Sequence, residues 1–101
     1  MQYLKLKKKL YSKKYTWLIT GVSGFVGSNL LNELLNLDQK VVGVDNFSNS
    51  SANNLKLIRK SISKKLWKNF QFIKGDLCNL NICKKAIKNV DIVLHQAARG
   101  S

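Results

Sequence analysis

The chain has 101 residues, 45% of them hydrophobic, so it forms one domain at most and has the composition of a globular protein. No apolar run approaches the roughly 20 residues of a membrane-spanning helix, and lysines interrupt any signal-peptide core at the N-terminus. The formal net charge of +13 raises nucleic-acid binding as an alternative class, but the lysines are spread from Lys5 to Lys88 instead of forming one stripe.

The two cysteines, Cys78 and Cys83, have no second Cys or His pair beside them. The sequence therefore predicts neither a metal site nor a disulfide framework. We expect two reduced thiols in a cytoplasmic protein.

Residues 1–14 form a basic N-terminal segment. Tyr3, Leu6 and Leu10 have helical spacing, which favours a short helix docked outside the rest of the fold. A frayed tail is the alternative, because the lysines of this segment repel one another.

Residues 15–20 predict a first strand that is buried on both faces, as in a parallel sheet. Gly21, Gly24 and Gly27 follow at three-residue spacing, and a helical pattern over residues 24–37 starts at once. The first-turn N–H groups of such a helix, together with the positive end of its dipole, form a seat for phosphate. This arrangement predicts dinucleotide binding, and a glycine-rich turn without a ligand is the alternative.

The apolar side of this first helix is expected to carry five residues and to face the sheet. These residues are Phe25, Val26, Leu30, Leu34 and Leu37.

Residues 41–44 predict the second strand, which ends at Asp45, 18 positions beyond Gly27. That distance is close to the roughly 20 residues expected for the acid that accepts hydrogen bonds from the adenosine ribose. A carboxylate there would repel a 2′-phosphate, so it favours NAD over NADP. The alternative is a turn aspartate at a strand end.

The remaining pattern continues the alternation of strands and helices. Residues 46–51 form a polar loop, 52–60 a helix, 63–69 a return segment, 70–74 a third strand, 80–88 a helix and 90–95 a fourth strand. His95 is expected to be a packing or hydrogen-bonding residue and not a catalyst. We predict an α/β fold, a Rossmann-like doubly wound parallel sheet with its first four strands in the order 3-2-1-4.

Four segments at the strand ends together carry a family resemblance. They read Thr-Gly-Val-Ser-Gly-Phe-Val-Gly, Val-Asp-Asn-Phe, Gly-Asp-Leu and Leu-His-Gln-Ala-Ala. From residue 15 onward the chain resembles the N-terminal part of NAD-dependent epimerases and dehydratases, in the extended short-chain dehydrogenase/reductase family. Within that family it is most similar to UDP-N-acetylhexosamine 4-epimerases, the UDP-N-acetylglucosamine enzymes of Vi-type polysaccharide synthesis, and a nucleotide-sugar dehydratase or decarboxylase is the alternative.

The resemblance implies NAD as the cofactor, a UDP-sugar as the substrate and a homodimer for the full-length protein. The implied cofactor residues are Gly21, Gly24, Phe25, Val26 and Gly27 at the pyrophosphate, Asp45, Asn46 and Ser48 at the ribose, Asp76 and Leu77 at the adenine, and Gln96, Ala97 and Ala98 near the nicotinamide. Gly100 and Ser101 match positions that begin the sugar site.

In the family a tyrosine removes a sugar hydroxyl proton while NAD takes the C4 hydride, and a lysine assists in a Tyr-x-x-x-Lys pair located after the fourth strand. Tyr3 and Lys7 have this spacing but precede the first strand. We therefore expect no catalytic residue in residues 15–101, and a truncated or split epimerase that lacks the C-terminal substrate domain and is inactive alone. The fourth strand would then be an exposed edge, and a chain that completes another subunit's sheet is a third interpretation.

Overall fold

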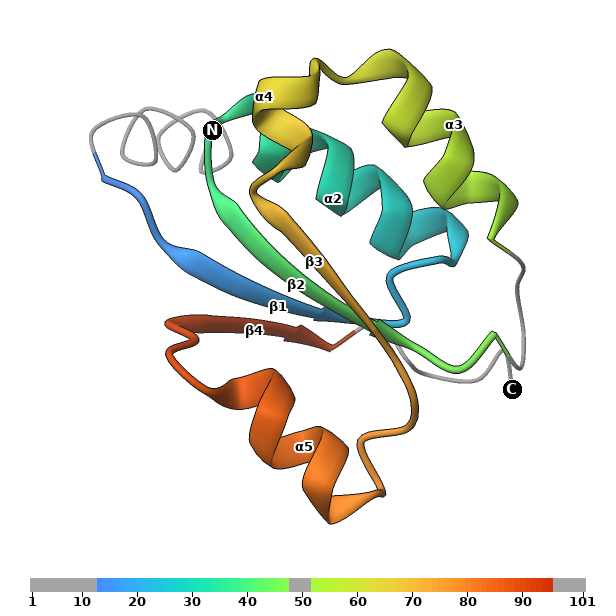
Figure 1. The fold of residues 1–101 in the computed structure, drawn as a ribbon, viewed down its shortest axis with the longest axis vertical. Coiled ribbons are helices and arrows are strands. Elements are labelled where there is room, and N and C mark those ends of the chain that lie inside the picture. The colour runs from blue at the N-terminus through green and yellow to red at the C-terminus, as the bar shows by residue number, and fades with distance from the viewer. Residues whose placement is uncertain (1–12, 48–51, 96–101) are drawn as a thin grey trace.

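A parallel sheet carries the fold, and the computed structural model describes residues 13–47 and 52–95 of the chain (Figure 1). Its elements are β1 (Thr16–Thr20), α2 (Phe25–Asn36), β2 (Lys40–Asp45), α3 (Asn53–Ser61), α4 (Lys64–Trp67), β3 (Phe70–Lys74), α5 (Leu80–Ile87) and β4 (Ile92–His95). The four strands lie in the order β3-β2-β1-β4, and each neighbouring pair is parallel. The predicted fold class and strand order are confirmed.

The helices cover the two faces of the sheet unequally. Figure 1 shows α2, α3 and α4 on one face and α5 on the other. Right-handed crossovers explain this, because the chain moves outward from β1 to β3 and then returns across the sheet to β4. The reversal of direction places the last crossover helix on the opposite face.

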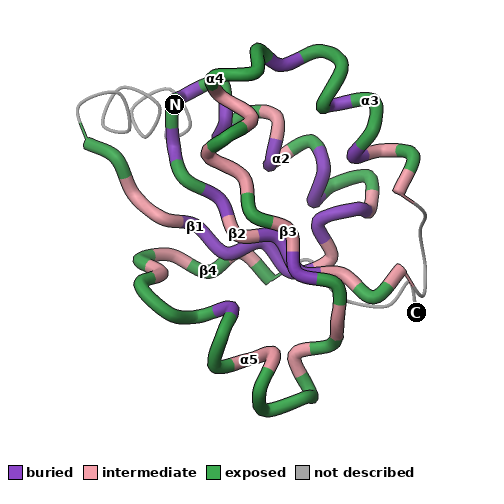
Figure 2. The backbone as a smooth tube through the Cα atoms, in the orientation of Figure 1, coloured by how far each residue is buried: buried purple, intermediate pink, exposed green. Residues whose placement is uncertain are grey.

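The first strand is buried on both faces, as predicted (Figure 2). Trp17 and Ile19 pack into the larger core cluster with α2 and α3, and Leu18 packs into a smaller cluster with Val44, Ile73 and other residues of the opposite face. The α5 side is thinly covered, since Ile87 at the end of that helix is 49% exposed.

The prediction of the buried side of α2 was wrong at its start. Phe25 is 78% exposed and Val26 is 53% exposed, whereas Leu31 and Leu35 are fully buried. At 100° per residue the buried face is centred on Leu31, and Gly27 on the same face lets the helix backbone approach the glycine loop closely. A prediction from apolar residues alone therefore misplaces the buried face of α2, because Gly27 and Ser28 belong to that face.

The other differences concern boundaries. The segment predicted as a simple return, residues 63–69, contains the short helix α4, whose first turn is capped where the Ser63 hydroxyl accepts a hydrogen bond from the Leu66 amide at 3.3 Å. Strand β4 begins at Ile92, two residues later than predicted. Just before it, the Asp91 amide donates to the Thr16 carbonyl at 2.8 Å, while the Asp91 side chain accepts the hydrogen bond of the Thr16 amide at 2.8 Å.

Strand β4 forms one edge of the described sheet and pairs with β1 alone there. Val93 in its centre is 54% exposed, so the predicted apolar edge strand is confirmed for this part of the chain. Within the described residues no helix is long and apolar enough to span a membrane. The expectation for residues 1–14 falls almost wholly outside the described residues, which begin at residue 13.

Gln39 is a buried polar residue that joins the turn after α2 to the start of β1, with 1% of its surface exposed. Its Oε1 accepts hydrogen bonds from the Tyr15 amide at 2.8 Å and from Trp17 Nε1 at 3.0 Å. Its Nε2 donates to the carbonyl oxygens of Lys13 at 2.9 Å and Leu37 at 3.3 Å. Buried polar groups are stable only when paired, so this side chain fixes the chain entry into the sheet.

Gln39→Ala should lower the free energy of unfolding by about 2–4 kcal/mol, because it leaves the Trp17 indole N–H and backbone groups buried without partners. Urea unfolding followed by tryptophan fluorescence measures this loss. Gln71→Ala, which removes an exposed glutamine of β3, is the matched control and should change stability by less than about 0.5 kcal/mol. Equal effects of the two substitutions would contradict the structural role of Gln39.

Candidate functional site

The carboxyl ends of the described strands meet at one edge of the sheet, because all pairings are parallel. The glycine loop follows β1, Asp45 ends β2, the Gly75-Asp76 turn follows β3, and His95 ends β4. The order reverses between β1 and β4, and open α/β sheets bind ligands at such a switch point. The segments singled out from the sequence that the structure describes thus lie at one edge of the sheet.

The loop between β1 and α2 is held against the end of β2. Gly21 has a φ of 69°, a left-handed conformation that favours glycine. Its amide donates to the Val44 carbonyl at 2.8 Å, and its own carbonyl accepts from the Gly24 amide at 3.1 Å. The loop therefore turns sharply while remaining attached to the sheet.

Gly24 and Gly27 differ in the space around them. A Cβ on Gly27 would stand 2.3 Å from the Gly21 carbonyl oxygen, closer than atoms can approach, so the helix packs directly on the loop. A Cβ on Gly24 would meet only that same oxygen, at 3.4 Å, which is ordinary contact. Gly27 thus serves packing, and Gly24 leaves open space at the start of the helix.

The N-terminus of α2 is arranged to receive an anion. The Ser28 amide donates to the Gly24 carbonyl at 2.9 Å and begins the helical pattern, so the amides of residues 25–27 have no intrahelical acceptor. Gly24 offers no side chain to cap them, and the first turn contains no acidic residue. The exposed side chains of Phe25 and Val26 flank these donors. The positive end of the helix dipole acts in the same direction as these amides.

Asp45 is a hub for three segments. Its Oδ2 accepts the Ser23 amide at 2.9 Å and also the Ser23 hydroxyl, in the glycine loop. Its Oδ1 accepts the Phe47 amide at 2.8 Å, which holds Phe47 at a φ of 60°. The Phe47 ring stacks on Phe72 of β3 with centroids 5.4 Å apart. The predicted ribose acid therefore also organises the backbone around it.

Ser23 and Asn54 were not identified from the sequence. Ser23 is completely buried, and its carbonyl accepts a hydrogen bond from Asn54 Nδ2 at 2.9 Å, which attaches α3 to the glycine loop. Ser23 lies between two glycines of the loop, and Asn54 lies in a polar run, so neither residue carries a periodic signal.

The Asp76 carboxylate lies exposed after β3 and accepts the Cys78 amide at 2.9 Å. The hydrogen bonds from the Cys78 amide and thiol lower the pKa of Asp76 below its ordinary value, which keeps the group ionised. The same contact raises the pKa of the Cys78 thiol, which makes it a poorer nucleophile. Leu77 beside it is half-buried against the smaller core cluster.

His95 forms a hydrogen bond through Nδ1 with the Thr20 hydroxyl at 2.9 Å. This contact joins the ends of β4 and β1 at the switch point, so the prediction of a hydrogen-bonding histidine is confirmed. No group of three or more His, Cys, Asp or Glu side chains that could hold a metal ion is found among residues 13–47 and 52–95.

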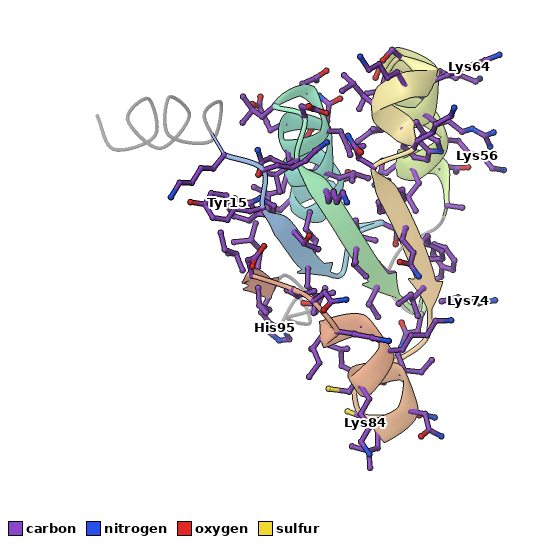
Figure 3. All side chains as sticks on the ribbon, turned by 60° about the vertical axis from the view of Figure 1, so that its left-hand side comes forward. Tyr15, Lys56, Lys64, Lys74, Lys84 and His95 are labelled. Carbon is purple, nitrogen blue, oxygen red and sulfur yellow. The ribbon has the colours of Figure 1, made fainter. Side chains whose placement is uncertain are left out.

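The cations of the described chain lie on separate elements. Figure 3 shows Lys56 and Lys64 on the α3 and α4 side, and Lys84 on α5 beyond the opposite face. This distribution agrees with the spread of lysines seen in the sequence and differs from a single basic groove.

Several predicted residues lie outside the described part of the structure. They are Ser48, Gln96, Ala97, Ala98, Gly100, Ser101 and the discounted pair Tyr3 and Lys7. Asn46 is described and exposed, directly after Asp45.

Comparison with known proteins identifies relatives of this chain. It is 34% identical over 82 residues to a UDP-glucose 4-epimerase of Pisum sativum, an alignment that covers 79% of this chain and 23% of the relative. Epimerase Mth375 of Methanothermobacter thermautotrophicus has a similar fold, with a TM-score of 0.76 at 29% identity over 98% of this chain and 27% of that one. The enzyme WbmH of Bordetella bronchiseptica, solved in complex with NAD+, gives a TM-score of 0.70 at 29% identity over 86% of this chain and 27% of that one.

The chain spans about a quarter of the length of these relatives, which is 23% of the pea enzyme and 27% of each solved structure. Residues 17–101 match the sequence profile of the NAD dependent epimerase/dehydratase family. That match includes the glycine loop, Asp45, the Gly75-Asp76 turn and the end of β4. The chain therefore belongs to the NAD dependent epimerase/dehydratase family.

Proposed function

We propose that this chain forms the NAD-binding part of a nucleotide-sugar 4-epimerase. The observation that carries the proposal is the placement of the α2 N-terminus beside Asp45, through the Ser23 contacts. An anion seat and a ribose acceptor at one sheet edge are the two parts that a dinucleotide requires. The UDP-glucose 4-epimerase among the relatives supports the reaction class.

The glycine loop and the first turn of α2 would hold the pyrophosphate. The space at Gly24 allows the ligand to approach the backbone, and the amides of residues 25–27 supply donors. The proposed contacts are Gly21, Gly24, Phe25, Val26 and Gly27.

Asp45, with Asn46 and Ser48, would hold the adenosine ribose. The Asp45 carboxylate accepts hydrogen bonds, so it suits an unphosphorylated ribose and opposes a 2′-phosphate. We therefore propose that this site binds NAD in preference to NADP.

Further along the same edge, Asp76 and Leu77 would contact the adenine. Gln96, Ala97 and Ala98 would lie near the nicotinamide, and Gly100 and Ser101 would begin the sugar site, as the family resemblance implies. When bound, NAD supplies a reversible hydride acceptor for C4 of the sugar. The residues of this chain bind and orient the dinucleotide.

For the sugar we propose a UDP-N-acetylhexosamine, and for the setting a cytoplasmic homodimeric enzyme of polysaccharide synthesis. The support is the resemblance of Val-Asp-Asn-Phe-Ser, which begins at the end of β2, and of Leu-His-Gln-Ala-Ala, which begins at the end of β4, to such epimerases. Turnover of UDP-glucose but not of the N-acetylated sugar by the enzyme that contains this domain would contradict the choice.

The first test separates folding from binding at the glycine loop. Gly27→Ala should destabilise the fold by about 1–3 kcal/mol, because its Cβ would clash with the Gly21 carbonyl. Gly24→Ala should keep most of the stability and weaken NAD binding about tenfold, because its methyl group fills the space that the pyrophosphate needs. Thermal unfolding and calorimetric NAD titration measure the two effects. Unchanged NAD affinity in a folded Gly24→Ala protein would contradict the pyrophosphate site.

The second test concerns cofactor choice. The wild-type chain should bind NAD more tightly than NADP, and Asp45→Asn should reduce that preference about tenfold by removing the charge that opposes the 2′-phosphate. Asparagine keeps an oxygen that can accept a hydrogen bond from the neighbouring amides, so it disturbs the hub less than alanine would.

Asp38→Asn is the matched control, since Asp38 is an exposed aspartate before the start of β2, far along that strand from Asp45. It also has a positive φ of 57°, which asparagine tolerates. The control should leave the NAD preference unchanged. Salt-sensitive duplex binding that is indifferent to Asp45→Asn, without NAD binding, would favour the nucleic-acid alternative.

The third test addresses catalysis. The purified 101-residue chain should show no 4-epimerase turnover of UDP-sugars, because a positioned acid or base is commonly worth about 10²–10⁴-fold in rate, and the resemblance places that pair after β4. A coupled assay with NAD and each UDP-sugar measures it. Detectable turnover that survives repurification would reject the proposed inactivity.

A further inference from the structure

The Asp45 carboxylate is held in place by Ser23, and this contact bears on cofactor choice. Ser23 donates both its amide and its hydroxyl to one oxygen of the acid, Oδ2. The other oxygen, Oδ1, accepts a hydrogen bond from the Phe47 amide at 2.8 Å. A carboxylate has about four acceptor positions on its two oxygens, so the three donors found among the described residues leave one acceptor position, on Oδ1.

We propose that Ser23 is a positioning residue that fixes the Asp45 carboxylate for recognition of an unphosphorylated ribose. The inference rests on the proposed NAD site. Two donors on Oδ2 set the rotamer of the acid and aim the remaining acceptor of Oδ1 outward to a ribose hydroxyl. They also keep the negative charge from swinging away when a 2′-phosphate approaches.

The setting of Ser23 makes it suited to this role. Its side chain is completely buried, so water does not compete with Asp45 for the hydroxyl. Its carbonyl is attached to α3 through Asn54 Nδ2 at 2.9 Å, and its neighbours in the loop are attached to the end of β2. Hydrogen bonds to an ionised acceptor are the stronger kind, so the acid is held by a rigid support.

The test compares two buried serines of the same loop and helix. Ser23→Ala removes one donor to Asp45, whereas Ser28→Ala removes a hydroxyl that donates to the Phe25 carbonyl at 3.1 Å. Ser23→Ala should weaken NAD binding about three- to tenfold with little effect on NADP, so the NAD to NADP preference falls by the same factor. Ser28→Ala should leave the preference unchanged.

Coupling to Asp45 is measured in the Asp45→Asn background. There Ser23→Ala should change NAD affinity by less than about twofold, because residues that act as one unit are not additive. Additive losses, an equal loss for both dinucleotides, or an unchanged preference in a folded Ser23→Ala chain would each overturn the inference.

Amide hydrogen exchange of the wild-type chain supplies a second measurement that needs no variant. Exchange at the Ser23 amide should be slower when NAD saturates the chain, because the contact with Asp45 persists in the complex. Faster exchange would mean that the ribose displaces Ser23 and would overturn the inference. Failure of the wild-type chain to bind NAD would overturn the proposed function together with it, whereas NAD binding with an unchanged preference in Ser23→Ala would overturn the positioning role alone.

Discussion

The close packing of α2 on the glycine loop is the constraint on which the site depends. Gly27 lies against the Gly21 carbonyl, at a distance that no Cβ could occupy. This contact sets where the helix begins, and so brings its first-turn amides to the edge where β2 ends. A methyl group at position 27 would push the helix away from the loop. The helix would still cover the sheet, but the positive end of its dipole would no longer lie beside Asp45.

Asp45 then joins the glycine loop to the loop that follows β2. Its two oxygens contact the glycine loop and the loop after β2, and the latter contact supports the left-handed conformation of Phe47. The carboxylate that we propose for ribose recognition is thus already held by contacts within the folded structure. Preorganisation of this kind lowers the entropic cost of ordering the site when a ligand binds. It also means that removal of the Asp45 side chain would affect folding and recognition together.

The sequence was sufficient to predict the arrangement of the sheet, because alternating strands and helices with right-handed crossovers leave few topologies. It was also sufficient to predict the sharp turn at Gly21. It was insufficient where contacts join residues distant along the chain. Gln39, Ser23 and Asn54 are ordinary polar residues in local patterns, and only the folded chain brings Asn54 to the Ser23 carbonyl. The apolar count also misplaced the buried face of α2, since Gly27 contributes to that face without a side chain.

The two faces of the sheet are unequally stabilised, and the proposed site crosses from one to the other. Val93 pairs in register with Leu18, on the face where α5 is the covering helix, and is nevertheless 54% exposed. The proposed pyrophosphate and ribose contacts lie on the well-packed β1 and β2 side, while the proposed nicotinamide contacts follow the edge strand β4. A ligand that binds only the folded chain stabilises it by mass action, so binding across the switch point would stabilise β4 by holding it to β1. In the described structure, a side-chain hydrogen bond between His95 and Thr20 joins the ends of these two strands.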